Sequence, residues 1–551
     1  MSFFSRDLSL ALTRRFAMGL CLSMGMNAAA TGLTPSHGGK AGVRTRGAAI
    51  DGSREGSGVG SRSGAREGSK DGSRDGSRDG SRDGSAQTQL PKPAPAPPLV
   101  LAGGTVVDVT DWGHSANDLH DAVIYIRDGR ITAVGPRAAL PIPKGSRVID
   151  CTGKFLIPGL IDGFAGMNSQ AQANANLYMG VTTVVASGDD RRGHIDQHAS
   201  PTPHIYLLDS VGSTDDWSLL IGHPGWASKL KDVNGRSVEL SPEDTARQLT
   251  ETAKLGTRVL WLGHNLTAAN TQWIIEHAHQ MGLVTYGEFI STPYRVGIQA
   301  GVDALLHMSR YELGVVPDEL QQPLMDDPEG AASRTAYGYS ERLPPTDPHV
   351  RDYAQFIAAH HAALMPTFSL YYLRLPDHRN LWKEPAAQLF TPKSFNTPSD
   401  PATGEAVYPL PNWSRHLPNT AIRWMEESAR HKADLEASKL WTLNQAIFEA
   451  YPHYLAASGA PALGTMPGIS LHTELEMLVR LGLSPREAIA AATNNYSEQF
   501  NWHELGQIAP GRRADILVLD GDPTVNVWNA RRITTILMDG NEIDRPALLK
   551  K

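Results

Sequence analysis

Glu288 and His307 are the side chains of this sequence that are best placed to do chemistry. Each lies at or near the end of an apolar run that is typical of a buried strand, over residues 284–289 and 302–307. A carboxylate and an imidazole on neighbouring strands could act together as acid and base without a metal. The same two groups could instead form a buried Glu–His contact with a structural role only, and both interpretations stay open.

A third polar candidate is His264, three residues after Trp261 in the predicted strand 258–262. Two other histidine groups have ligand-like spacing, namely His194, His198 and His204, and His277 with His279. They lie in a predicted loop and a predicted exposed helix without a carboxylate pattern nearby, so a replacement metal site there is the alternative, not the expectation. Residues 159–500 contain no Gly-x-Ser-x-Gly sequence, which disfavours a serine nucleophile.

The elements that must position these residues alternate between strands and helices over residues 159–500. Ser241 followed by Pro242 and two acidic residues is typical of a helix start, and strands are predicted before and after each helix. Repeating strand–helix units indicate a parallel sheet. Residues 99–158 and 501–551 instead contain short strands, with Asp128-Gly129 as a hairpin turn.

The front of the chain has a different composition. Arg14 and Arg15 precede an apolar stretch that closes with three alanines, so residues 1–30 are predicted to be a secretory signal. The paired arginines leave open whether export follows the general or the twin-arginine route, and an uncleaved membrane anchor is the alternative. We expect an exported protein, periplasmic or secreted. Cys151 would then be the one cysteine of the mature chain, which excludes an internal disulfide.

Residues 31–98 are predicted to be a disordered linker. They contain a repeat of Gly, Ser, Arg and Asp and then a proline-rich spacer, with few apolar side chains to bury. A tether is the expected role, and binding of an anionic partner or of a surface is the alternative. The whole chain has 551 residues and a net charge of -7, so a nucleic-acid partner is not expected. No membrane span is expected after cleavage of the signal.

Two stretches carry a family resemblance. Phe155 to Met167 contains Pro-Gly-Leu-Ile-Asp, and Gly506 to Ile516 contains the pattern Gly-x-Ile-x-x-Gly-x-x-Ala-Asp-Ile. Both resemble signatures of the metal-dependent amidohydrolase superfamily, in particular its imidazolonepropionase and dipeptidase-like members. The resemblance implies a (β/α)8 TIM-like barrel over residues 159–500. It also implies a composite β-sandwich built from 99–158 and 501–551, with the site at the carboxyl ends of the barrel strands.

The resemblance also implies a metal-ligand set of two histidines on strand 1, a bridging carboxylated lysine or a glutamate on strand 4, histidines on strands 5 and 6, and an aspartate on strand 8. The corresponding positions here hold Phe164, Gly166, Trp261, Glu288, His307 and Met466, with strand 8 taken as residues 461–465. Only Glu288 and His307 are metal donors. We therefore expect no resident metal, and a divalent ion such as zinc only if a site is rebuilt around His264, Glu288 and His307.

Three functional hypotheses follow. The family resemblance implies a hydrolase of non-peptide or dipeptide-like C–N bonds. The altered ligand positions favour a pseudoenzyme, a non-catalytic barrel that binds a small ligand or partner through the long loops 312–350 and 376–418. The third hypothesis is a metal-free acid–base enzyme that uses Glu288 and His307. The expected partner is a small-molecule substrate or ligand, and family members often form homodimers.

Overall fold

The computed structural model describes residues 97–550 except 187–194, 198, 213–238, 264–265, 290–291, 318–319, 321–338, 340–342, 345, 396–398 and 406–443. The predicted signal, nearly all of the predicted linker, and the candidates His264, His194 and His198 lie outside the described residues. In the part that is described, no helix is long and apolar enough to cross a membrane.

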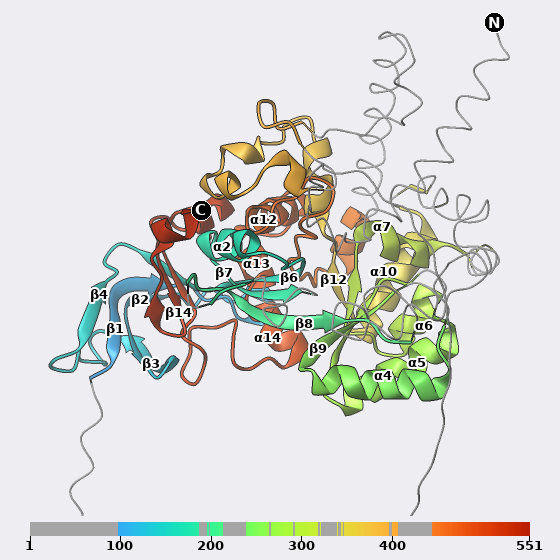
Figure 1. Cartoon of the computed structure of the whole chain (residues 1–551), viewed down its shortest axis with the longest axis horizontal. Coiled ribbons are helices and arrows are strands. Elements are labelled where there is room, and N and C mark those ends of the chain that lie inside the picture. Colours follow the sequence, from blue (N-terminus) through green and yellow to red (C-terminus); the bar gives the residue numbers. More distant parts are fainter. Residues whose placement is uncertain are drawn as a thin grey trace, which may run out of the picture. The chain divides into compact units, whose positions relative to one another are not determined.

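Strands from the two ends of the chain form one eight-stranded sheet. Its N-terminal members are β1 (Leu99–Val106), β2 (Leu119–Arg127), β3 (Arg130–Pro136), β4 (Arg147–Asp150) and β5 (Phe155–Pro158), and its C-terminal members are β13 (Ile516–Leu519), β14 (Ile533–Met538) and β15 (Asn541–Glu542). The order is β15-β14-β13-β5-β1-β2-β3, with β4 paired to β1. The antiparallel pairing of β13 with β5 joins the two ends of the chain. Figure 1 shows the N-terminal strands β1 and β2, in blue, beside the C-terminal strand β14, in red.

The predicted Asp-Gly hairpin is confirmed. Arg127 of β2 pairs with Arg130 of β3, so Asp128 and Gly129 form a two-residue loop. Both loop residues have positive φ, 48° and 74°, as a type I′ turn requires. This turn sets the register in which the buried face of β2 packs against the sheet core.

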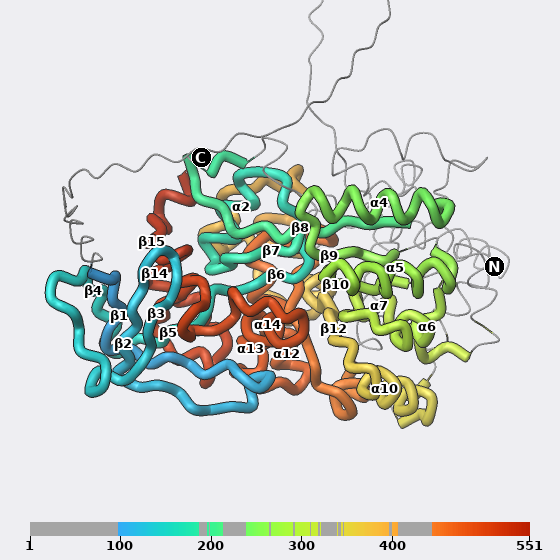
Figure 2. The backbone as a smooth tube through the Cα atoms, turned by 90° about the horizontal axis from the view of Figure 1, so that it is seen from below, coloured from blue at the N-terminus to red at the C-terminus, as the bar shows by residue number. Residues whose placement is uncertain are grey.

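The second sheet is parallel and curls into a barrel. It contains β6 (Leu160–Ala165), β7 (Val181–Ala186), β8 (His204–Asp209), β9 (Thr257–Leu262), β10 (Val284–Gly287), β11 (Ala304–Leu306) and β12 (Ala363–Met365), hydrogen-bonded in that order. Every residue of β7 is buried, as expected for a strand covered on both faces. With the helices around it, this sheet confirms the TIM-like α/β class (Figure 2).

Helices follow or precede the strands. They are α2 (Gln170–Tyr178), α4 (Pro242–Lys254), α5 (Ala268–Gln280), α6 (Tyr294–Gln299), α7 (Met308–Tyr311), α10 (Pro348–His360), α12 (Ile469–Leu481), α13 (Pro485–Ala491) and α14 (Asn494–Phe500). The predicted start of α4 is confirmed, because the Ser241 side chain accepts a hydrogen bond from the Asp244 backbone N–H and Pro242 occupies the first turn.

The eighth barrel position is filled by a segment that the sequence did not indicate. Tyr454 forms a parallel bridge with Leu364 of β12, and the Gly163 N–H of β6 donates to the Ala456 carbonyl at 3.2 Å. The backbone around Tyr454 and Ala456 therefore lies between β12 and β6 and closes the barrel.

The prediction of strand 8 over residues 461–465 is wrong. This stretch forms turns, in which the Thr465 N–H donates back to the Ala462 carbonyl at 3.0 Å. Pro461 has no N–H for a ladder, and Leu463 and Gly464 have positive φ, which an extended strand does not allow. Met466 is thus not the last residue of a barrel strand.

Candidate functional site

Glu288 and His307 lie next to each other at the carboxyl ends of neighbouring strands, as the sequence predicts. Glu288 follows β10 and His307 follows β11, and both side chains are buried. His307 Nε2 lies 3.8 Å from Glu288 Oε2. This separation is an ion-pair distance and is too long for a direct hydrogen bond.

Arg310 completes this polar group, and our sequence analysis missed it. Its Nε donates to Glu288 Oε1 at 3.1 Å, and the guanidinium is itself buried. Arg310 belongs to the short helix α7, which begins directly after His307 and brings residue 310 back over the strand ends. The one sequence signal was its spacing, three residues after His307, which is nearly one helical turn.

Thr367 contacts the other side of the imidazole. His307 Nδ1 lies 2.7 Å from Thr367 Oγ1, and both residues are buried. Thr367 follows β12 and has φ 51° and ψ 45°, while His307 has φ 60°. Positive φ at residues other than glycine is uncommon, and for a β-branched threonine it is an outlier.

Two aromatic side chains stand where the family resemblance places metal ligands. The Phe164 ring meets the His307 imidazole edge-on with ring centroids 5.3 Å apart, and it lies 6.2 Å from the Trp261 ring. Gly166 lies one residue beyond β6, with its N–H on the Ala460 carbonyl. Phe164 and Trp261 therefore form an apolar wall beside the polar group.

Met466 does not belong to this wall. Its side chain is buried in the large outer core cluster, whereas Phe164 and Trp261 pack in the cluster inside the barrel. The Met466 N–H donates to Ser470 Oγ just before α12. The assignment of Met466 to the pocket is corrected, because the predicted strand that would have carried it there is a turn.

The metal centre implied by the family resemblance does not fit the described residues at the strand ends. The guanidinium of Arg310 occupies Glu288 Oε1 at 3.1 Å, so a divalent ion bound there would face a buried cation. Phe164 and Trp261 supply no ligand atoms of the kind that zinc prefers. We therefore derive no catalytic step through a metal at these residues.

Two further carboxyl groups are buried behind the strand ends. Asp162 of β6 accepts from the Ser458 N–H at 2.8 Å, and burial raises the pKa of Asp162 to about 6. Glu474 of α12 accepts from the Ser369 N–H at 2.6 Å, and burial raises its pKa to about 8. The Ser369 hydroxyl donates to the Ser458 carbonyl at 2.6 Å, so one network links both acids.

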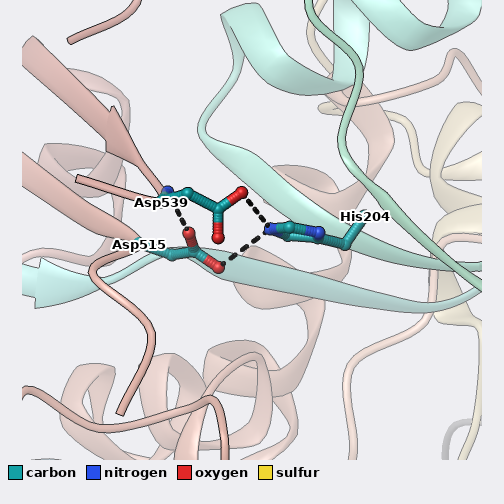
Figure 3. Close-up of side chains that lie close together, drawn as sticks. All are labelled: His204, Asp515 and Asp539. Atoms are coloured by element: carbon teal, nitrogen blue, oxygen red, sulfur yellow. Dashed lines mark hydrogen bonds and ion pairs between the residues drawn. The ribbon is translucent and has the colours of Figure 1, made fainter. Parts of the chain in front are cut away.

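A separate group lies at the opposite end of the barrel, where β8 begins. His204 Nε2 is 3.2 Å from Asp539 Oδ2 and 3.6 Å from Asp515 Oδ2 (Figure 3). The three ligand atoms all lie within 4.8 Å of one another and could hold a metal ion. Arg513 Nε, however, already donates to Asp515 Oδ2 at 2.9 Å. With Arg513 present, a single proton on His204 balances the negative charges of the two aspartates, whereas a divalent ion would add excess positive charge.

Burial lowers the pKa of the His204 imidazole, but its contacts with Asp515 and Asp539 favour the charged ring. The net result is that the pKa of His204 lies above its usual value. In the sequence, His204 stands out only by its spacing from two other histidines. Its actual partners are more than 300 residues away, at the start of β13 and after β14.

Comparison with known sequences gives matches over parts of the chain. Residues 457–543 match the sequence profile of the Amidohydrolase family. Dihydropyrimidinase-related protein 5 from Homo sapiens is 33% identical over 148 residues, which cover 24% of this chain and 24% of that protein. An adenine deaminase from Ruegeria pomeroyi is 24% identical over 185 residues, which cover 33% of this chain and 29% of that protein. The matches thus span less than a third of these curated relatives.

Comparison with solved structures extends over most of the chain. A Xaa-Pro dipeptidase with bound methionine in its active site superimposes with a TM-score of 0.50 and 15% identity, covering 81% of this chain and 99% of that chain. At this level of identity the likeness shows a shared fold.

Proposed function

Because this chain belongs to the amidohydrolase superfamily, we propose that it hydrolyses non-peptide or dipeptide-like C–N bonds of small molecules. The names of its deaminase and dipeptidase neighbours support C–N bond hydrolysis as the reaction class. The site is the polar group Glu288, His307 and Arg310 at the carboxyl ends of β10 and β11, where TIM barrels place their reactive residues. The observation that carries the proposal is this buried group beside the wall of Phe164 and Trp261.

In this proposal the chemistry proceeds without a metal at the strand ends. Nε2 of His307 accepts a proton from the attacking water and returns it to the leaving nitrogen, so that an amide and water give a carboxylic acid and an amine. Glu288, held by Arg310, stabilises the imidazolium that forms between the two transfers. Phe164 and Trp261 bind the apolar part of the substrate and exclude competing water.

A second candidate function is binding without turnover, a pseudoenzyme role. The contact between Arg310 Nε and Glu288 Oε1 favours it, because a guanidinium on a carboxylate reduces the basicity of that carboxylate. Such a barrel would use the polar group and the aromatic wall to bind a ligand or a partner.

The first experiment measures metal content and hydrolysis on the same full-length sample, purified without chelator or metal-affinity resin. The substrates are a panel of N-acyl amino acids, dipeptides and cyclic amides, each with and without EDTA. The proposal expects turnover that EDTA does not change and that Glu288→Gln and His307→Asn abolish. Glu276→Gln, the same chemical change on the exposed face of α5, is the control and should leave turnover unchanged.

The outcomes separate the candidates. Turnover that depends on about one or two metal ions per chain would contradict the metal-free mechanism and direct attention to His264, which lies outside the described residues. Saturable ligand binding without turnover, retained in Glu288→Gln, would support the binding role. Absence of both would leave neither function standing.

We also propose that the chain is exported through its residues 1–30, to the periplasm or the medium, and that the mature protein forms a homodimer. The apolar stretch and the alanine triplet at the end of that segment support export. Mass spectrometry of the mature N-terminus tests the first proposal, and light scattering of the purified chain tests the second.

A further inference from the structure

The hydroxyl of Thr367 forms two short contacts, and together they determine where its hydrogen points. Thr367 Oγ1 donates to the Pro366 carbonyl at 2.7 Å. It also lies 2.7 Å from His307 Nδ1. A threonine hydroxyl has one hydrogen and two lone pairs. If that hydrogen pointed at His307 Nδ1, the Thr367 hydroxyl oxygen and the Pro366 carbonyl oxygen would face each other at 2.7 Å with no hydrogen between them.

The hydrogen of Thr367 therefore goes to the carbonyl, and the hydroxyl oxygen accepts a hydrogen from the imidazole. His307 must then carry a hydrogen on Nδ1. In the neutral ring the lone pair is left on Nε2, the nitrogen that lies 3.8 Å from Glu288 Oε2. The tautomer of a histidine is set in this way by the hydrogen bond of its other nitrogen.

The backbone on both sides holds this contact in place. The His307 N–H donates to the Met365 carbonyl at 2.9 Å, the Met308 N–H donates to the Pro366 carbonyl at 3.0 Å, and the Thr367 carbonyl accepts from the Leu370 N–H at 3.1 Å. These bonds stabilise the positive φ of both Thr367 and His307. Unfavourable backbone conformations of this kind persist where surrounding contacts over-determine them, and they cluster at functional sites.

We propose that Thr367 is a positioning residue that holds His307 as the Nδ1–H tautomer and so leaves the Nε2 lone pair on the side of the ring that faces Glu288. The inference deepens the proposed function, since His307 is the proton-transferring group there. Its structural part, the tautomer, stands on geometry alone and can be tested without a substrate. Thr367 itself is not assigned contact with the reacting atoms.

The first test uses the unmodified full-length chain. Its histidines are labelled with ¹⁵N and the ring nitrogens are observed by NMR, with the His307 signals assigned by their loss in His307→Gln. On the alkaline side of the His307 titration, the proposal expects a protonated Nδ1 and an unprotonated Nε2. A neutral ring that carries its hydrogen on Nε2 would overturn the proposal without any substitution at Thr367.

The second test compares Thr367→Val with Thr367→Ser. Valine keeps the branched shape and removes the hydroxyl, whereas serine keeps the hydroxyl and removes a methyl group. The proposal expects the neutral His307 ring to change to the Nε2–H form in Thr367→Val and to keep the Nδ1–H form in Thr367→Ser. The same tautomer in both variants would overturn the role of the hydroxyl.

Where turnover is found, Thr367→Val should lower kcat by about 100-fold with little change in KM, because a positioned acid–base group contributes on the order of 10²- to 10⁴-fold. Thr367→Ser should retain most of the activity. A tautomer change without any turnover in the unmodified chain would contradict the proposed hydrolase but leave the positioning role intact. Failure of Thr367→Val to fold would still leave the test on the unmodified chain decisive.

Discussion

Removal of the Arg310 guanidinium should destabilise the protein more than removal of both charges of the Arg310–Glu288 pair. The Nε and Oε1 atoms are 3.1 Å apart, and both side chains are almost inaccessible to solvent. With an effective dielectric constant of about 20, their attraction is about 5 kcal/mol. The cost of removing both charges from water offsets much of this attraction, so the intact pair contributes little net stability.

Breaking the pair has a different consequence from replacing it. Arg310→Met keeps the aliphatic stem but leaves the Glu288 charge buried without its guanidinium, which should lower the free energy of unfolding by about 3–5 kcal/mol. The double variant Arg310→Met with Glu288→Gln removes both charges of this pair. It should recover at least about 1 kcal/mol relative to Arg310→Met alone, as expected for coupled neighbours.

The assay is urea unfolding at pH 7 of the unmodified chain, both single variants and the double variant, combined in a double-mutant cycle. Arg137→Met is the control, because the Arg137–Asp121 pair has a similar distance of 2.9 Å but is largely exposed, and its loss should cost less than about 1 kcal/mol. The reasoning is refuted if Arg310→Met costs no more than this control, or if the double variant is as unstable as the sum of the singles.

Two further predictions concern pH. Glu474 has a pKa of about 8 when folded and 4.5 as its ordinary value, so only the unfolded chain releases this proton between those pH values and stability falls as the pH rises. Glu474→Gln should remove that loss and raise the free energy of unfolding at pH 7 by about 3 kcal/mol, which is 2.5 pH units at 1.36 kcal/mol each; equal slopes of unfolding free energy against pH in the two proteins would contradict this. For His204, whose pKa is raised, the stabilisation is fully present below its ordinary pKa of 6.5 and is lost as the pH rises through the folded value. His204→Gln should therefore lower the melting temperature at pH 5.5 and have little effect at pH 9, and a uniform decrease at both pH values would rule out the ionic contact as its cause.

The pairing of Glu288 with His307 could be predicted from the sequence, and the physical reason is the register of parallel strands. Both residues end apolar runs of consecutive strand–helix units, and consecutive parallel strands are neighbours whose carboxyl ends meet. The hairpin at Asp128-Gly129 and the start of α4 at Ser241 were predictable because local turn and cap chemistry determines them. For these features, residues close in sequence carry all of the information.

Other parts of the site were decided by contacts between distant segments. The segment that closes the barrel depends on backbone bonds to β12 and β6. The Pro-Ala-Leu-Gly-Thr sequence at 461–465 resembles a strand locally, although Pro461 has no N–H to donate and Leu463 and Gly464 adopt positive φ in turns. The orientation of His307 depends on Thr367, which lies 60 residues away. Sequence alone thus determined that Glu288 and His307 reach the mouth of the barrel. Only the tertiary structure decided which atoms they contact, because their partners Arg310 and Thr367 follow the neighbouring strands β11 and β12 and come within reach only when these strands pair.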